Sequence, residues 1–454
     1  MTASRSDQIL ALDVSLTPLR PALLLDGTGE MSVLVRVSAP EAPAVDAPVT
    51  PLSLALVIDR SGSMDGGRLE AALGCARNLV QRLRDQDEVS VIIYDDQAEV
   101  LLPLTAAAQA RDSIDSLLAG VVVGGSTALY DGWMLGASQL APRTGGDRMC
   151  RVILLSDGQA NRGLTDEAEI CERVRRLAGA GVTTTTVGLG EGFNESLMTG
   201  IAKAGHGNAL YGDRAEDLAE PFDAEIGLLA QIACRDLRLI AGSATRRWVL
   251  CNDYSRSGEE TAELGAWALP DLVAGSEAWA VFRAPMDSVI RAQARSRQGM
   301  ALHVTVNGRD PLGRRVTQQA SLAPLPLVDE SQWRALPPDE LVSRRVTELR
   351  AAELQRAARL AVEEGDWERA EQILREAETL AADQPWVKGV VAHLQGLLQR
   401  RDRLRFGKEA MFASHRMSTR ITTSSERAEY DEVEEAALPS FLRKKLAQGR
   451  RTAT

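Results

Sequence analysis

The sequence predicts an α/β fold with a doubly wound, mostly parallel sheet. This sheet is inserted in, or followed by, a β-sandwich, and a C-terminal helical segment comes after it. Three observations lead to this prediction. From Leu52 onward, short apolar runs alternate with amphipathic stretches, as strand–helix units do when a parallel sheet is covered on both faces. Residues 232–325 lose the helical period. Residues 338–400 regain it, with Ala, Leu and charged residues at helical spacing.

The composition is that of a folded protein of several domains. The chain has 454 residues, 44% of them hydrophobic and 25% charged. At roughly 100–200 residues per domain, this length predicts two to four domains. The 63 acidic and 52 basic residues give a net charge of −11. That balance argues against a general nucleic-acid binder, which needs a basic surface to displace counterions.

Cysteine and histidine usage argues against several kinds of site. The five cysteines are far apart and form no CxxC pair, and the four histidines form no HExxH motif. We therefore expect no disulfide framework, no zinc site and no zincin protease. No stretch approaches the roughly 18 consecutive apolar residues that a membrane helix needs, and residues 1–7 contain no apolar signal region. We expect a soluble, cytoplasmic protein without a membrane span.

Residues 1–50 are predicted to supply strands to the β-sandwich. Met31–Val37 alternates its side chains with the period of a strand. The Pro-rich stretch Ala39–Pro51 is predicted to be a linker. Because these N-terminal strands have no sheet of their own, we expect them to pair with strands of residues 233–328.

Residues 51–232 carry the strand–helix alternation. Leu54–Ile58 is wholly apolar, as is typical of a strand buried on both faces. Arg68–Leu83 places its apolar side chains on one stripe of a helix. The other predicted strands are Val89–Tyr94, Glu99–Leu102, Arg151–Leu155, Val182–Val187 and Ala209–Tyr211. The other predicted helices are Ala106–Leu118, Leu129–Leu140, Asp166–Ala178, Glu195–Ala204 and Glu216–Leu229.

Residues 233–328 are predicted to form the β-sandwich. Six short runs are separated by Gly, Asp and Pro turns, at a spacing typical of such a fold. The predicted strands are Asp236–Ile240, Trp248–Cys251, Thr261–Leu264, Trp279–Phe282, Leu302–Val306 and Arg315–Gln319.

Residues 329–405 are predicted to be helical. Gly365–Ala370, followed by Leu374, Ala377 and Leu380, resembles part of a tetratricopeptide repeat. The unit occurs once, whereas a solenoid needs about three or more stacked repeats. We therefore expect a helical hairpin packed on the body, with a peptide-binding groove as the alternative.

Residues 406–454 are expected to be a charged, flexible tail. Glu426–Glu435 holds six acids and one Arg. Leu438–Leu446 is a short apolar and basic motif, for which a C-terminal helix and a linear peptide recognised by a partner are both open. The Ser and Thr residues at 422–425 lie beside acids, a composition that permits phosphorylation.

Oxygen-bearing side chains follow the ends of predicted strands. Asp59, Ser61 and Ser63 come directly after the first buried strand. Thr127 stands at the start of a helix after a Gly–Gly turn, and Asp157 follows the fourth strand. With the strand order 3-2-1-4-5-6, the first and fourth strands are neighbours where the order reverses, and ligands bind at that point. We therefore predict that these five side chains converge on one crevice.

All five residues supply oxygen, and none supplies nitrogen or sulfur. This set of donors favours a hard divalent cation, Mg²⁺, with Mn²⁺ or Ca²⁺ as alternatives. Octahedral Mg²⁺ takes six ligands and usually retains water, so three hydroxyls and two carboxylates leave a position open. A cation whose charge stays partly unquenched attracts a carboxylate from a partner.

This pattern resembles the metal-ion-dependent adhesion site of the von Willebrand factor A (VWA) domain, a DxSxS motif with a distal Thr and a distal Asp. The resemblance covers about Leu52–Ile232 and implies a Rossmann-like fold. It implies that the three hydroxyls coordinate the metal directly and the two carboxylates directly or through water. It also implies that a partner's Asp or Glu is the last ligand. The flanking strands and residues 233–328 resemble bacterial cytoplasmic chains in which the A domain is inserted into a β-sandwich.

Three classes of function follow from this site. The first, which we predict, is a non-enzymatic scaffold that captures a protein partner's carboxylate through Mg²⁺. The second is a self-assembling structural or regulatory subunit, in which the acidic segment Glu426–Glu435 or another subunit occupies the metal site. The third is a metal-dependent hydrolase. The metal loops contain no His that could act as a general base, and the chain has no GxxxxGK[ST] loop, so we predict no catalytic residue.

Overall fold

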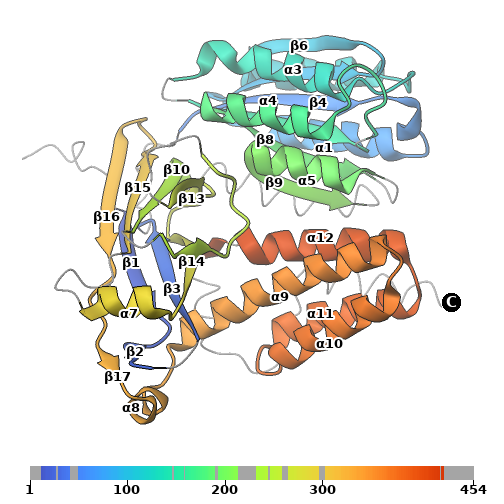
Figure 1. Ribbon diagram of the computed structural model, residues 1–454. Helices are drawn as coiled ribbons and strands as arrows, with labels where there is room; N and C mark the ends of the chain where they lie inside the picture. Colours follow the sequence, from blue (N-terminus) through green and yellow to red (C-terminus); the bar gives the residue numbers. More distant parts are fainter. Residues whose placement is uncertain are drawn as a thin grey trace, which may run out of the picture.

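A six-stranded sheet, two antiparallel sheets and a set of C-terminal helices make up most of the part of the chain that the structure describes (Figure 1). The computed structural model describes residues 12–26, 29–40, 50–145, 148–157, 159–189, 193–212, 232–243, 246–257, 264–295, 302–419 and 421–423. Within these residues, no helix is both long enough and apolar enough to cross a membrane.

The six-stranded sheet has the order β6-β5-β4-β7-β8-β9, which is the predicted order 3-2-1-4-5-6. Its strands are β4 (Leu52–Asp59), β5 (Glu88–Tyr94), β6 (Ala98–Ala106), β7 (Met149–Ser156), β8 (Val182–Leu189) and β9 (His206–Gly212). Neighbouring strands are parallel except β6, which runs antiparallel to β5. All residues of β4 and β7 are buried, as expected for central strands covered on both faces.

Helices cover both faces of this sheet. They are α1 (Arg68–Arg82), α2 (Ala107–Ala119), α3 (Leu129–Leu140), α4 (Glu167–Gly179) and α5 (Glu195–Ala204). In β4, Leu54 and Leu56 pack with α1 and α2, whereas Ala55 between them packs with α3, α4 and α5. The alternation confirms the predicted doubly wound, mostly parallel sheet. The predicted helix Glu216–Leu229 lies outside the described residues.

Two antiparallel sheets share a separate apolar core. The first sheet consists of β1 (Asp13–Pro18), β3 (Glu30–Ser38), β14 (Ser276–Pro285), β11 (Val249–Leu250) and β18 (Ile421–Thr423). The second consists of β12 (Gly265–Ala268), β10 (Ile232–Gly242), β13 (Leu272–Val273), β15 (His303–Arg309) and β16 (Arg315–Ser321). Val35 and Phe282 of the first sheet and Leu239 of the second belong to one apolar cluster. β3 precedes the six-stranded sheet in the sequence and β14 follows it, and the two strands pair along their length. The first antiparallel sheet therefore combines strands from before and after the six-stranded sheet in the chain.

The sequence predicts these antiparallel strands unevenly. Predicted strands overlap β10, β11, β14, β15 and β16, and Thr261–Leu264 falls mostly on residues outside the described part. Several short elements were not predicted, because tertiary contacts rather than a repeating pattern define them. They are β12, β13, α7 (Ser288–Arg295) and β17 (Leu327–Val328), which pairs in parallel with β2 (Leu23–Leu24). The short helix α8 (Glu330–Ala335) falls within the region that was predicted to be helical.

Four helices form the C-terminal segment, where we expected a hairpin. They are α9 (Glu340–Glu363), α10 (Trp367–Leu380), α11 (Pro385–Gln399) and α12 (Arg403–Thr419). Each packs against the next, and α12 returns to α9. The expectation of a flexible tail from residue 406 is wrong for residues 406–419. The basic residues of this stretch led to that expectation, although the stretch also contains buried apolar residues at helical spacing. These residues are Phe406, Ala410, Ala413 and Met417.

After α12 the chain returns to the first antiparallel sheet. There β18 pairs with β14 and places Thr423 opposite Ser276. Residues 424–454 lie outside the described part of the chain, and with them the acidic segment Glu426–Glu435 and the motif Leu438–Leu446.

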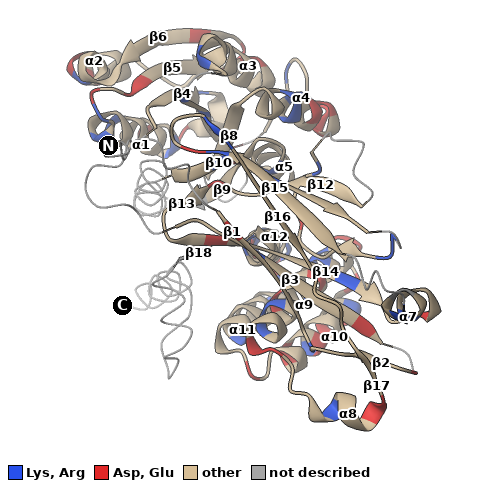
Figure 2. Ribbon diagram, turned by 90° about the vertical axis from the view of Figure 1, so that its left-hand side faces the viewer, with Lys and Arg blue, Asp and Glu red and all other residues tan. Residues whose placement is uncertain are grey.

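Acidic and basic residues are interspersed along the C-terminal helices (Figure 2). Ion pairs link Arg350 with Glu353 on α9 and Arg375 with Glu371 on α10. Pairs at this spacing on a helix contribute roughly 0.3–0.5 kcal/mol each. α9 and α10 therefore present no continuous basic face of the kind that nucleic-acid binding needs.

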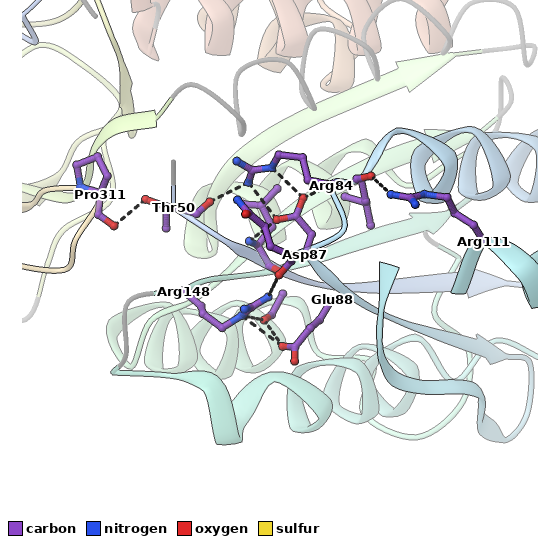
Figure 3. A network of polar contacts seen from close by, with 11 residues as sticks. Thr50, Arg84, Asp87, Glu88, Arg111, Arg148 and Pro311 are labelled. Carbon is purple, nitrogen blue, oxygen red and sulfur yellow. Dashed lines mark hydrogen bonds and ion pairs between the residues drawn. The ribbon is translucent and has the colours of Figure 1, made fainter. Parts of the chain in front are cut away.

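Polar contacts connect the amino ends of the six-stranded sheet to the antiparallel sheets (Figure 3). Asp87, just before β5, accepts hydrogen bonds from the Leu52 N–H at 2.9 Å and from Arg84 at 3.0 Å. Arg84 also donates to the Thr50 carbonyl at 2.9 Å. The Thr50 hydroxyl in turn donates to the carbonyl of Pro311, between β15 and β16, at 3.0 Å. These contacts with the antiparallel sheets therefore lie at the amino ends of the strands, whereas the candidate site lies at their carboxyl ends.

Candidate metal site

The carboxyl ends of β4 and β7 meet at the centre of the six-stranded sheet. The two strands are parallel neighbours, with Ile58 opposite Leu155, so Asp59 and Ser156 leave the sheet side by side. The strand order reverses between β4 and β7. The helices that follow them, α1 and α4, lie on opposite faces. This is the place in a doubly wound sheet where a crevice opens and ligands bind.

Asp59 is a fully buried carboxylate held by neutral donors. Its Oδ1 accepts a hydrogen bond from the Ser61 N–H at 2.8 Å. Its Oδ2 accepts from the Ser156 hydroxyl at 2.7 Å and from the Tyr94 hydroxyl at 3.2 Å. Burial raises the pKa of Asp59 from 3.8 to about 6, although the bonds from Ser156 and Ser61 work to lower it, and nearby Asp157 raises it further. The negative charge of Asp59 at neutral pH is therefore poorly compensated.

The two serines of the turn lie next to each other. The Ser61 and Ser63 hydroxyl oxygens are 3.1 Å apart. Ser61 is buried and directly precedes the 3₁₀ turn Gly62–Met64 that leads to α1, and Ser63, within that turn, is half-buried. Two hydroxyl oxygens at this spacing, beside a carboxylate, are ligands that a hard cation accepts.

The loop that carries Thr127 packs against this turn. The Gly124 N–H donates to the Arg60 carbonyl at 2.6 Å, and the Gly62 N–H donates to the Gly125 carbonyl at 2.8 Å. A Cβ atom at Gly124 would lie 2.0 Å from the Asp95 carboxylate. A larger residue at Gly124 would therefore push the Asp95 side chain aside, and the two backbone hydrogen bonds hold the loop beside the turn.

Thr127 is 1% exposed and is held through its main chain. Its N–H donates to the Asn161 side-chain oxygen at 2.8 Å. Its carbonyl accepts from the N–H groups of Asn161 and Arg162, each at 3.2 Å. These bonds join the Thr127 loop to the loop after β7.

Asp157 is 1% exposed and only partly bonded. Its Oδ1 accepts from the Gln159 N–H at 3.2 Å, and its carbonyl accepts from the Asn194 N–H at 2.9 Å. Its Oδ2 is buried and has no hydrogen-bond partner among the described residues. A buried carboxylate oxygen without a donor is satisfied by water or by a cation, so the residues present fit a divalent metal ion.

The set of donors also fits a hard cation. Among the described residues, no group of three or more His, Cys, Asp or Glu side chains could hold a metal. A cation at this edge therefore depends on hydroxyl as well as carboxylate oxygens, which suits Mg²⁺, Mn²⁺ or Ca²⁺.

Sequence reasoning missed three residues around the site. Tyr94 and Ser156 are the last residues of β5 and β7, the two neighbours of β4, and both donate to Asp59. Their position at strand ends beside Asp59 could have indicated them. Asn161 gave no such signal, because its bond to Thr127 depends on how two loops fold together.

Residues 53–224 match the family model of the von Willebrand factor type A domain. This match, together with the strand order, confirms a VWA domain in this part of the chain.

Two curated relatives share part of this chain. The uncharacterized protein YfbK of Escherichia coli is 29% identical over 201 residues, which are 43% of this chain and 34% of that protein. The uncharacterized protein sll0103 of Synechocystis is 29% identical over 164 residues, which are 35% of this chain and 37% of that protein. The chain therefore spans little more than a third of the length of these relatives.

Solved structures resemble the chain over most of its length. The von Willebrand factor type A protein of Catenulispora acidiphila has a TM-score of 0.65 at 17% identity and covers 91% of this chain and 98% of its own. VWA2, the ArnB paralog of Sulfolobus acidocaldarius, has a TM-score of 0.58 at 18% identity and covers 89% and 99%. At these identities the likeness shows the fold. It extends beyond the six-stranded sheet to the antiparallel sheets and helices.

Proposed function

We propose that the VWA domain of this chain is a non-enzymatic interaction scaffold that holds Mg²⁺ and through it captures a carboxylate of a protein partner. Domains of this family commonly bind a divalent ion and mediate protein–protein interaction. The observation that carries the proposal is the Asp157 Oδ2 atom. This atom is buried near Asp59 and has no hydrogen-bond donor in the described part of the chain. Buried charges are normally paired or coordinate a metal.

The ion would supply a positive charge with a coordination position open to a partner's carboxylate. Mn²⁺ or Ca²⁺ can take the same oxygen ligands. The five proposed ligands are Asp59, Ser61, Ser63, Thr127 and Asp157. Tyr94 and Ser156 hold the Asp59 carboxylate in place through hydrogen bonds, as outer groups commonly do for metal ligands.

The groups around the site favour binding over catalysis. Metal-assisted hydrolysis needs a general base beside the attacking water. Burial, with Asp59 alongside, raises the pKa of Tyr94 well above 10, so its hydroxyl stays protonated and remains a donor. Arg60 forms an ion pair with Asp95 at 3.2 Å. We therefore assign no catalytic residue.

Self-association through the same site is the second candidate. Because β18 pairs with β14, the acidic segment Glu426–Glu435 begins three residues after a strand joined to the body. Attachment of this kind raises the effective concentration of a ligand. The carboxylate then comes from this segment of the same chain or of another subunit. Truncation after Thr423 is expected to change the oligomeric mass or to increase partner capture, and no change in either would exclude this candidate.

The test combines metal titration with partner capture. Mg²⁺ and Mn²⁺ are titrated into the full chain by calorimetry, and partners are captured from native lysate in Mg²⁺, in EDTA and with Asp59→Ala. We expect saturable ion binding, and a specific prey that is lost both in EDTA and with Asp59→Ala.

The matched control is Asp115→Ala. Asp115 lies on α2 and is ion-paired with Arg77, and 67% of its side chain is exposed. This variant is expected to keep both metal binding and prey. A set of captured proteins that EDTA leaves unchanged contradicts the proposal. Turnover of a phosphoester or peptide that depends on Asp59 would favour the hydrolase instead.

A further inference from the structure

Helix α12 of the C-terminal segment packs against the VWA domain. In Figure 1 it lies between α5 and α9. The Phe412 ring of α12 is 6.0 Å from the Phe193 ring, which stands two residues before α5. Phe412 belongs to the apolar cluster of α3, α4 and α5. The C-terminal helices and the VWA domain thus share a core at this contact.

Lys408, one helical turn before Phe412, makes a second contact with the same segment. Its ammonium lies 4.7 Å from the centre of the Phe193 ring and 3.8 Å from the Glu195 carboxylate. Lys408 is 4% exposed, so these contacts are largely shielded from water. Partly desolvated cation–π contacts are worth more than exposed ones. α12 therefore holds both Phe193 and Glu195.

The residue between them, Asn194, contacts the candidate metal site. The Asn194 N–H donates to the carbonyl of Asp157 at 2.9 Å. The Asn194 side chain caps α5 by accepting from the Leu197 N–H at 3.1 Å. The Phe193 ring also lies against β8, where a Cβ atom on Gly188 would be 2.5 Å from it. Residues 193–195 therefore contact α12, β8 and the main chain of Asp157.

The other end of α12 is attached to the rest of the molecule. Buried Arg345 of α9 donates to the carbonyls of Met417 at 2.6 Å and Ser418 at 3.1 Å. Asn252, next to the first antiparallel sheet, donates to the Ser418 carbonyl at 2.6 Å. α12 therefore connects the first antiparallel sheet with residues 193–195, which contact Asp157.

We propose that Phe412 and Lys408 are positioning residues for the candidate metal site. They hold residues 193–195 and, through the Asn194 N–H, hold the main chain of Asp157 where its carboxylate can serve a cation. The proposal rests on the proposed function of the site. A ligand that displaces α12 then lowers cation affinity, and by thermodynamic linkage a bound cation opposes that displacement.

The test measures Mn²⁺ affinity of the full chain by calorimetry and electron paramagnetic resonance, with Mn²⁺ as the probe. Phe412→Leu is expected to weaken Mn²⁺ binding roughly fivefold or more, the lower end of typical coupling between sites. Lys408→Met is also expected to weaken Mn²⁺ binding. Lys408→Arg is expected to keep the wild-type Mn²⁺ affinity, because the side chain at this position stays positively charged.

The matched control is Phe406→Leu. Phe406 lies on the same helix and is fully buried, but it packs among the C-terminal helices. This variant is expected to bind Mn²⁺ as the wild type does. Hydrogen exchange gives a second readout. Mn²⁺ is expected to slow exchange of the Asn194 amide in the wild type and in Phe406→Leu, and to slow it less in Phe412→Leu.

The outcomes separate the two proposals. If the wild type binds Mn²⁺ and Phe412→Leu binds it equally well, the positioning role is wrong and the proposed function stands. If Phe412→Leu and Phe406→Leu weaken binding equally, general loosening of the helices explains the effect and the positioning role is also wrong. If the wild type binds no Mn²⁺, both proposals fail.

Discussion

At the amino ends of the six-stranded sheet, buried Asp87 is paired with Arg84 (Figure 3), whereas at the carboxyl ends buried Asp59 accepts hydrogen bonds from neutral groups. Glu88, next to Asp87, shows the same contrast. Burial works to raise its pKa, but hydrogen bonds from Arg143 and Ser53 and the nearby Arg148 lower it. The pKa of Asp59 is instead raised to about 6. The pKa of Glu88 at the amino ends and the pKa of Asp59 at the carboxyl ends therefore shift in opposite directions.

The difference lies in where the compensating charge comes from. At the amino ends the chain supplies it, since Arg84 and Arg148 lie beside Asp87 and Glu88. At the carboxyl ends, the described residues pair no Lys or Arg with Asp59 or Asp157. Perturbed groups that lack a partner within the fold are typical of functional sites. The comparison therefore indicates that Asp87 and Glu88 stabilise the structure, and it supports the proposal that Asp59 and Asp157 bind a cation.

The largest expected effect on stability is at the amino ends. Asp87→Ala removes the acceptor of the Leu52 N–H and leaves the Arg84 guanidinium unpaired. Breaking a buried ion pair costs about 3–5 kcal/mol, and the partial exposure of the Arg84 side chain, at 29%, places this loss at the lower end of that range. Cation affinity is expected to stay unchanged, because the site lies at the other end of the strands. Denaturant unfolding and Mn²⁺ titration of the variant measure the two quantities.

Asp85→Ala is the matched control for this change. The Asp85 side chain is 82% exposed and is ion-paired with Arg111, and such surface pairs contribute about 0–1 kcal/mol. The variant is therefore expected to unfold close to the wild type. If Asp87→Ala also weakened Mn²⁺ binding, the two ends of the sheet would be coupled. The separate roles given to their carboxylates would then be wrong.

The second effect is a dependence of stability on pH at the carboxyl ends. Because the folded protein raises the pKa of Asp59 from 3.8 to about 6, its protonated form favours the folded state. That stabilisation is complete below pH 3.8 and is lost as the pH rises through about 6. Over the whole of this pH range the loss amounts to about 3 kcal/mol, of which about 1–1.5 kcal/mol falls between pH 5 and pH 7. The metal-free protein is therefore expected to be less stable at pH 7 than at pH 5, relative to Asp59→Asn.

Melting temperatures of the wild type and Asp59→Asn, measured without metal across this pH range, test that dependence. Mg²⁺ is expected to stabilise the wild type more at pH 7 than at pH 5, because a protonated Asp59 is a poor ligand. Mg²⁺ is expected to have little effect on Asp59→Asn at either pH. A difference in melting temperature between wild type and variant that does not change from pH 5 to pH 7 would contradict the raised pKa of Asp59.

The order of the strands could be predicted because local patterns determine it. An apolar run such as Leu54–Ile58 is long enough to predict a buried strand, and its end fixes where Asp59 stands. Repeated strand–helix units then leave few possible topologies. The predicted positions of the five ligands at strand ends and in the Gly–Gly loop follow from the same local signals.

The contacts that join distant parts of the chain could not be predicted in this way. The basic residues of α12 favoured a prediction of a flexible tail over a packed helix. No local pattern in the sequence indicates that the Phe412 ring contacts the Phe193 ring. The bond from Asn194 to the Asp157 carbonyl also depends on the folded path of the main chain. Local patterns therefore predict the candidate ligands, whereas packing between segments determines what holds them.

The smallest expected effect comes from a single hydroxyl beside the site. Tyr94→Phe removes one of the two hydroxyl donors to Asp59 Oδ2 and keeps the buried ring. The loss of such a bond costs about 1 kcal/mol, which corresponds to roughly fivefold weaker cation binding. Tyr254→Phe is the control, since Tyr254 is also buried but donates to the Trp279 carbonyl in the antiparallel region. If Mn²⁺ titration shows equal affinity for both variants, the hydrogen bond from Tyr94 does not help to hold Asp59 as a ligand.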